Sequence, residues 1–120
     1  MKISAANVRT VVLLLGMLLL LPGWAVADEF DDQDAAKGLA ILQKNCARCH
    51  ALGLTGASPH PQAPRFRDVV KRYPVEDLEE SLAEGIVSGH PDMPEFTFGP
   101  NQIGAIVAYL NSLKAQENAK

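Results

Sequence analysis

The sequence lacks the short motifs that mark many soluble enzymes. Its serines stand in no nucleophile motif, and no glycine-rich stretch has the spacing of a phosphate-binding loop. It also lacks internal repeats and low-complexity tracts, which favours a single folded domain. Acidic residues outnumber basic ones, 14 to 11, and such a chain is a poor match for nucleic acid. We therefore expect neither an enzyme of these classes nor a nucleic-acid-binding protein.

Long hydrophobic runs are also scarce, and the only one lies near the N-terminus. Residues 11–21 are apolar and follow two basic residues, while Ala25 and Ala27 are small residues at the two positions that a signal peptidase reads. The run is shorter than the ~20 residues of a membrane span. We therefore expect a cleaved export signal over residues 1–27, with a retained membrane anchor as the alternative. The folded domain is then 28–120, in a bacterial periplasm.

Both cysteines of the chain lie in one short motif, Cys46-Ala47-Arg48-Cys49-His50. The C-x-x-C-H spacing is the attachment signature of c-type haem. Two thiols three positions apart can each add to one vinyl group of a single porphyrin, and the adjacent histidine is then held beneath the iron. We therefore predict one haem c, with Cys46 and Cys49 as its covalent attachments and His50 as the proximal iron ligand.

Two other interpretations of the cysteine pair remain open. A dithiol or disulfide redox centre expects a βαβ context, whereas the flanks here are predicted to be helical. A zinc site would need two more ligands, His60 and His90, which lie in proline-rich loops at spacings that match no zinc motif. A haem-free redox protein that uses Cys46 and Cys49 is therefore kept as an alternative.

One methionine, Met93, remains after removal of the leader. Pro94 disfavours the helical region for Met93, and Pro91 restricts the backbone two residues earlier, so this segment is predicted to be extended and stiff. A thioether held in this way can bind iron from the face opposite His50, and methionine–histidine ligation raises the reduction potential. We predict His50 and Met93 as the two metal ligands. The alternatives are that Met93 fills a gap in the core or that His90 is the second ligand.

Apolar residues recur at helical spacing in two longer segments, and no segment has a convincing strand pattern. The first helix is expected over residues 34–45, behind an acidic cluster at 28–34, with these residues on its buried face: Ala35, Leu39, Leu42 and Cys46. The last helix is expected to open at Pro100 and to bury these residues: Ile103, Ile106, Val107, Leu110 and Leu113. Shorter helices are predicted over 66–73 and 75–84, the second with its carboxylates outward.

Over residues 28–120 the sequence resembles the class I cytochromes c. The resemblance rests on the haem motif, on Gly38 eight residues before Cys46, and on Ile106, Tyr109 and Leu110, which are similar to the family's Leu-x-x-Tyr-Leu contact. It implies an all-α cytochrome c fold. The first and last helices would cross at the glycine, and two to three short helices and loops would wrap around one covalent haem.

The resemblance also extends to the segment after the haem motif. Pro64 followed by Phe66 is similar to the family's proline-x-leucine segment, which implies that the Pro64 carbonyl accepts a hydrogen bond from the distal ring nitrogen of His50. Tryptophan is absent after the leader. Arg65 and Arg67 are therefore candidates for contact with the haem propionates.

Basic residues concentrate around the haem motif. Residues 28–120 hold nine basic and fourteen acidic side chains, a formal charge of −5, yet residues 37–72 hold seven of the bases against Asp68 alone. These bases are Lys37, Lys44, Arg48, Arg65, Arg67, Lys71 and Arg72. We hypothesise that they rim the exposed haem edge and attract an acidic redox partner protein. Ordinary surface charge is the alternative.

The combined predictions favour a monomeric, monohaem electron carrier without stable membrane insertion after signal cleavage. It would cycle between Fe(III) and Fe(II) and would have no enzyme activity of its own. A haem enzyme or gas-binding sensor requires an open axial position on the iron, and it is the second functional class that the sequence allows.

Overall fold

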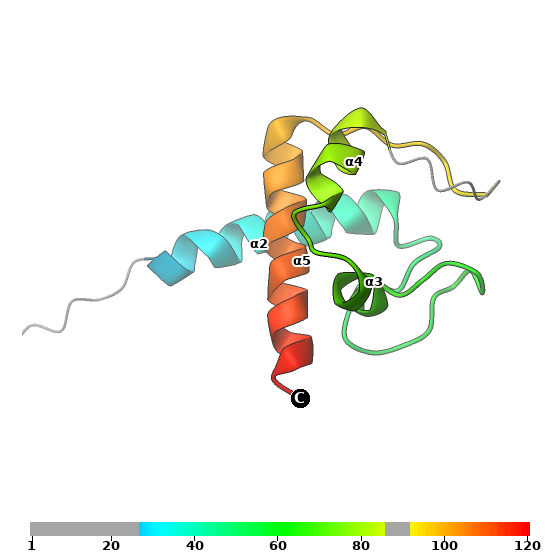
Figure 1. Cartoon of the computed structure of the whole chain (residues 1–120), viewed down its shortest axis with the longest axis horizontal. Helices are drawn as coiled ribbons and strands as arrows, with labels where there is room; N and C mark the ends of the chain where they lie inside the picture. The colour runs from blue at the N-terminus through cyan, green and yellow to red at the C-terminus, as the bar shows by residue number, and fades with distance from the viewer. Residues whose placement is uncertain (1–26, 86–91) are drawn as a thin grey trace, which may run out of the picture.

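The computed structural model describes residues 27–85 and 92–120, and the regular structure in these ranges is four α-helices without a strand. The helices are α2 (Ala27–Asn45), α3 (Phe66–Arg72), α4 (Leu78–Glu84) and α5 (Pro100–Asn118), as labelled in Figure 1. The all-α prediction is confirmed. The leader up to residue 26 and the predicted roles of His90 and Pro91 lie outside the described residues. Among the helices that are described, none is long and apolar enough to cross a membrane.

The first described helix, α2, is longer than predicted. It begins at Ala27, whereas the apolar spacing predicted a start at residue 34. The acidic cluster at 28–34 therefore lies within the helix instead of preceding it. The predicted buried face is confirmed: Leu42 is 2% exposed, Ala35 is buried, and Leu39 and Cys46 pack against the core.

Helices α2 and α5 cross at Gly38 (Figure 1). A β-carbon built on Gly38 would lie 1.9 Å from the carbonyl oxygen of Ala105 and 3.0 Å from the amide nitrogen of Ile106. No side chain fits in this space, so only glycine allows the two backbones to meet. The crossing predicted at this glycine is confirmed, and its nearest atom belongs to Ala105, one residue before Ile106.

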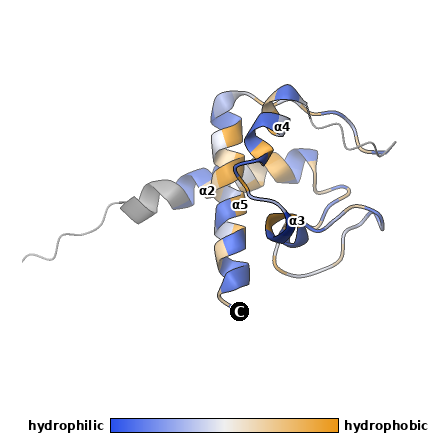
Figure 2. Cartoon of the chain, in the orientation of Figure 1, coloured by the Kyte–Doolittle hydropathy of each residue, from blue (hydrophilic) through white to orange (hydrophobic). Residues whose placement is uncertain are grey.

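The last helix, α5, supplies more buried residues to the core than any other described helix. It opens with Pro100 in its first turn, and the Gln102 side chain accepts a hydrogen bond from the Gly99 amide at 3.1 Å. These residues of α5 are buried: Ile103, Ala105, Ile106, Leu110 and Leu113. The predicted stripe is therefore confirmed, with Val107 only partly buried. Figure 2 shows apolar residues where α5 passes α2.

The two short helices pack against α5. Helix α3 ends at Arg72, one residue before the predicted end, and buries Val70, which is 1% exposed. Helix α4 begins at Leu78, three residues later than predicted. The reason is that the amides of Asp77 and Leu78 bond to carbonyls three residues earlier, a tighter turn than an α-helix. Val75 is nevertheless fully buried, as the pattern indicated.

The described residues around Met93, 92–99, are linked to α4. The amide of Phe98 donates a hydrogen bond to the carbonyl of Leu82 at 2.9 Å, which joins α4 to the residues before α5. Close by, Gly85 has a φ of 108°, and a β-carbon there would lie 2.6 Å from the Glu95 carboxylate. The residues that follow Met93 are therefore fastened to α4 through Phe98.

Candidate haem site

The haem motif forms a tight turn at the end of α2. The Cys46 amide donates to the Leu42 carbonyl at 2.7 Å, which extends the helical pattern into the motif. The Cys46 carbonyl then accepts hydrogen bonds from the amides of Cys49 at 3.0 Å and His50 at 2.9 Å. Both cysteines are partly buried, and their thiols are free. The turn thus presents two thiols and one imidazole from five consecutive residues.

The surroundings of the Cys46 thiol do not favour dithiol redox chemistry. Burial, with a smaller effect of the neighbouring Cys49, raises the pKa of Cys46 from 9.0 to about 11. Dithiol redox centres need a lowered thiol pKa, which a helix N-terminus or a nearby cation supplies. This motif follows the C-terminal end of α2, where the helix dipole disfavours a thiolate. The environment therefore argues against the dithiol alternative.

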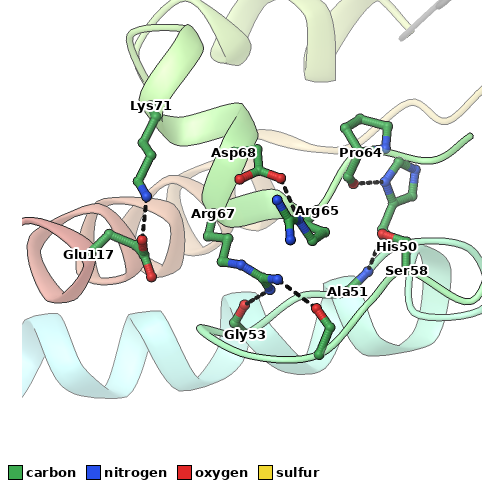
Figure 3. A network of polar contacts seen from close by, with 11 residues as sticks. His50, Ala51, Gly53, Ser58, Pro64, Arg65, Arg67, Asp68, Lys71 and Glu117 are labelled. Carbon is green, nitrogen blue, oxygen red and sulfur yellow. Dashed lines mark hydrogen bonds and ion pairs between the residues drawn. The ribbon is translucent and has the colours of Figure 1, made fainter. Parts of the chain in front are cut away.

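The His50 ring is oriented by two neighbours. Its Nδ1 lies 2.7 Å from the Pro64 carbonyl oxygen (Figure 3), the contact that the family resemblance implies. Because a carbonyl only accepts, Nδ1 carries the proton and Nε2 of the neutral ring keeps its lone pair. The Phe66 ring packs beside the imidazole, with ring centroids 5.2 Å apart. The residues present therefore fit a haem iron, which would bind at Nε2.

The loop after the motif is held by Arg67 of α3. Its guanidinium donates to the carbonyls of Gly53 at 3.1 Å and Gly56 at 2.6 Å (Figure 3). The residue is only 9% exposed, and Gly56 has a φ of 83°, a conformation that favours glycine. The sequence suggested Arg67 as a propionate contact. Its position shows that it organises the loop through carbonyl groups.

Arg65, the other propionate candidate, faces its own helix. Its Nε lies 2.5 Å from the Asp68 carboxylate, and this hydrogen bond is the main reason that the pKa of Asp68 is lowered. The next amide, that of Phe66, donates to the Ala51 carbonyl at 2.9 Å. This segment is therefore fastened directly to the residue after His50.

Two further residues hold the loop, and sequence reasoning assigned neither of these contacts. The Tyr109 hydroxyl on α5 donates to the Leu52 carbonyl at 2.8 Å, and burial raises the pKa of Tyr109. The Ser58 hydroxyl accepts a hydrogen bond from the Ala51 amide at 3.1 Å. The family resemblance implied that Tyr109 lies at the contact between the first and last helices, but no local pattern predicts which distant carbonyl it binds.

The structure brings four of the predicted site residues together by hydrogen bonds or short sequence separation: Cys46, Cys49, His50 and Pro64. Met93 lies on the separate segment before α5 and is partly buried. His60 lies 3.5 Å from the Asp92 carboxylate, between the two regions. Across residues 27–85 and 92–120, no three His, Cys, Asp or Glu side chains form a metal-binding group, and His90 lies outside these ranges.

Comparison with known proteins identifies the class. Residues 33–110 match the family described as cytochrome c oxidase, cbb3-type, subunit III. The chain is 32% identical over 81 residues to cytochrome c-552 of Bradyrhizobium diazoefficiens, covering 68% of this chain and 76% of that protein. It is 32% identical to the cytochrome c-553-like protein of Synechocystis, covering 67% and 70%. No solved structure matches the chain significantly.

A longer protein is also similar. The chain is 32% identical to the cbb3-type cytochrome c oxidase subunit FixP of Bradyrhizobium sp. over 87 residues, covering 65% of this chain and 30% of FixP. The similarity is thus to less than a third of that subunit.

The helical fold, the C-x-x-C-H motif and these relatives define a monohaem class I c-type cytochrome. The chain belongs to the family described as cytochrome c oxidase, cbb3-type, subunit III. Its cofactor is haem c, bound covalently through the cysteine pair at 46 and 49. As a cytochrome of this class it is an electron-transfer protein that works with redox partner proteins.

Proposed function

We propose that the protein is a periplasmic one-electron carrier in which His50 and Met93 occupy both axial positions of the haem iron. The observation that carries this proposal is the 2.7 Å contact between His50 Nδ1 and the Pro64 carbonyl, which leaves Nε2 as the metal-binding nitrogen. When bound, haem c supplies reversible one-electron transfer between Fe(III) and Fe(II).

The protein's part in this chemistry is to orient and tune the ligand. The Pro64 carbonyl accepts the Nδ1 proton of His50, which fixes the tautomer and makes Nε2 a more basic donor. The Phe66 ring limits rotation of the imidazole. Cys46 and Cys49 serve as the attachment points, because the turn that holds them also presents His50.

Whether Met93 binds the iron distinguishes an electron carrier from a haem enzyme. It lies in a non-helical segment that is followed by Pro94 and fastened at Phe98, which favours a fixed sulfur position over ordinary core packing. If His50 and Met93 both hold the iron, no coordination position is left open for a substrate or a gas. The oxidase activity implied by the name of FixP belongs to a larger protein, and the carrier function proposed here does not depend on it.

The contacts of the basic side chains reduce the number of cations that we propose for partner docking. Within the described residues, four of the seven basic side chains already have a partner in the same chain. Lys37 pairs with Asp34, Arg65 with Asp68 and Lys71 with Glu117, and Arg67 binds loop carbonyls. Lys44 and Arg48 are exposed beside the attachment motif. We expect these two cations to steer an acidic redox partner, and raised ionic strength to slow the reaction.

Export through the leader 1–27 accounts for how the cysteines and haem meet outside the cytoplasm. The mass of the purified protein tests this part. It should equal residues 28–120 plus one haem, whereas the mass of the full chain would indicate a retained leader.

The central experiment compares wild-type holoprotein with Met93→Ala. In both proteins the haem should stay with the polypeptide in acidified organic solvent, because the thioethers are unchanged. The wild type should show a sulfur-to-ferric-iron charge-transfer band, and the variant should lose it, bind carbon monoxide in the ferrous form and have a lower reduction potential.

A matched control is Leu78→Ala, which shortens a partly buried side chain on α4 and should keep the band. Ready binding of carbon monoxide by the wild-type ferrous protein would overturn the carrier proposal in favour of a gas-binding or catalytic cytochrome.

A further inference from the structure

A contact between two loops lies next to the proposed methionine ligand. His60 Nε2 is 3.5 Å from the Asp92 carboxylate, and Asp92 directly precedes Met93. The His60 side chain is 30% exposed and that of Asp92 is 66% exposed. The separation is long for a hydrogen bond but lies within the range of an ion pair. The contact joins the loop after the haem motif to the segment that carries Met93.

The histidine is itself tied to the attachment motif. The His60 amide donates to the Cys49 carbonyl at 3.1 Å, and the Ala63 amide donates to the His60 carbonyl at 3.1 Å. The Gln62 amide donates to His60 Nδ1 at 3.3 Å. Because Nδ1 accepts, the proton of the neutral ring sits on Nε2, which faces Asp92.

We propose that His60 and Asp92 form a strap that positions the Met93 sulfur for the iron, an inference that rests on the proposed methionine ligation. The methionine segment is fastened at its far end by the bond from Phe98 to Leu82. The strap supplies a fixed point one residue before Met93. His60 and Asp92 are positioning residues, because neither is required to touch the metal.

A positioning role follows from the flexibility of the ligand side chain. Methionine has three rotatable bonds, so its sulfur is placed only as well as its backbone. An exposed ion pair contributes little to global stability. The same contact can still change the fraction of molecules in which Met93 is bound, because Met93 directly follows Asp92 in the chain.

The experiment measures how easily an added ligand replaces Met93 in the ferric holoprotein. Imidazole is titrated into the wild type and into the variants Asp92→Asn, His60→Gln and Asp92→Glu. We expect Asp92→Asn and His60→Gln to bind imidazole about threefold to tenfold more tightly and to show a weaker charge-transfer band. Asp92→Glu keeps the carboxylate, so its imidazole affinity should be closer to that of the wild type.

A matched control and a double variant separate the strap from general charge effects. Asp34→Asn removes a carboxylate of similar exposure, 54%, which pairs with Lys37 on α2. It should leave imidazole binding unchanged. The double variant with His60→Gln and Asp92→Asn should bind imidazole about as tightly as either single variant, because both substitutions break the same His60–Asp92 contact.

Two failures can be told apart. Wild-type imidazole affinity in both Asp92→Asn and His60→Gln, with a charge-transfer band that still depends on Met93, would overturn the strap alone. A band that survives in Met93→Ala would overturn methionine ligation, and the strap with it.

Discussion

The crossing of α2 and α5 and the loops around the haem motif are built in different ways. At the crossing, backbone meets backbone at Gly38, and the residues beside it, such as Ile106 and Leu42, are 1% and 2% exposed. In the loops, most residues are partly buried or exposed, and their positions depend on a few hydrogen bonds that the backbone makes with side chains such as Arg67 and Ser58.

The helix crossing therefore sets the shape of the fold, whereas the loops place the groups that carry the chemistry. The crossing depends on the absence of atoms at one position, so any added volume disrupts it. The loops depend on donors and acceptors that reach from the helices, so removal of one group should affect a few residues only. The helices therefore serve as a rigid support, and the site is attached to it by a small number of polar contacts.

The strongest test of the crossing is Gly38→Ala. A β-carbon 1.9 Å from the Ala105 carbonyl forces the two backbones apart, and we expect a loss of about 3 kcal/mol or more in the free energy of unfolding. Urea unfolding of the holoprotein measures it.

The matched control for this substitution is Gly104→Ala in the opposite helix, where a β-carbon would meet nothing within 4 Å. It should stabilise the protein by roughly 0.5–1 kcal/mol through helix propensity. Equal effects of the two substitutions would mean that the crossing is not set by close approach.

A smaller loss of stability is expected from a substitution at Tyr109, which joins the loop after the haem motif to α5. Tyr109→Phe removes the hydrogen bond to the Leu52 carbonyl, and the loss in unfolding free energy should be about 1 kcal/mol. Hydrogen exchange should accelerate in the loop after the haem motif and not at the crossing. Tyr73→Phe, at a tyrosine that is 50% exposed, is the control and should change neither quantity. Uniform acceleration across the molecule would contradict the separation of the two regions.

The smallest change in stability is expected from a substitution of Glu117, which lies near the end of α5 and pairs with Lys71 of α3. Hydrogen bonds from Lys120 and Lys71 lower the pKa of Glu117 from 4.5 to about 2. A lowered folded-state pKa gives stability that is complete above pH 4.5 and is lost as the pH falls towards 2. Glu117→Gln should therefore lower the melting temperature at pH 7 and match the wild type near pH 2. A difference that persists at pH 2 would indicate lost packing instead of lost charge.

The sequence predicted the framework better than the loops. Helical periodicity identified the buried faces of α2 and α5, and Gly38 stood out because glycine is costly inside a helix without a packing reason. The start of α4 was wrong by three residues, because hydrophobic spacing does not distinguish an α-helical turn from the tighter turn after Pro74.

The haem motif was readable because its chemistry lies in five consecutive residues. The contacts that organise the site were not, since each joins residues distant in the sequence. Arg67 counted as one of seven surface bases, and only the fold shows that its charge is directed at the carbonyls of Gly53 and Gly56. The pairing of His60 with Asp92 could not be predicted either, because the spacing of residues in the sequence does not show which loops meet.

The bond between the Phe98 amide and the Leu82 carbonyl makes the methionine segment an exchangeable unit. Since the ends of this segment already meet, a segment of another length or composition could be grafted between them at a small cost in loop-closure entropy. The residue proposed as the iron's second ligand could thus be varied through evolution or engineering while the helices and His50 are left untouched.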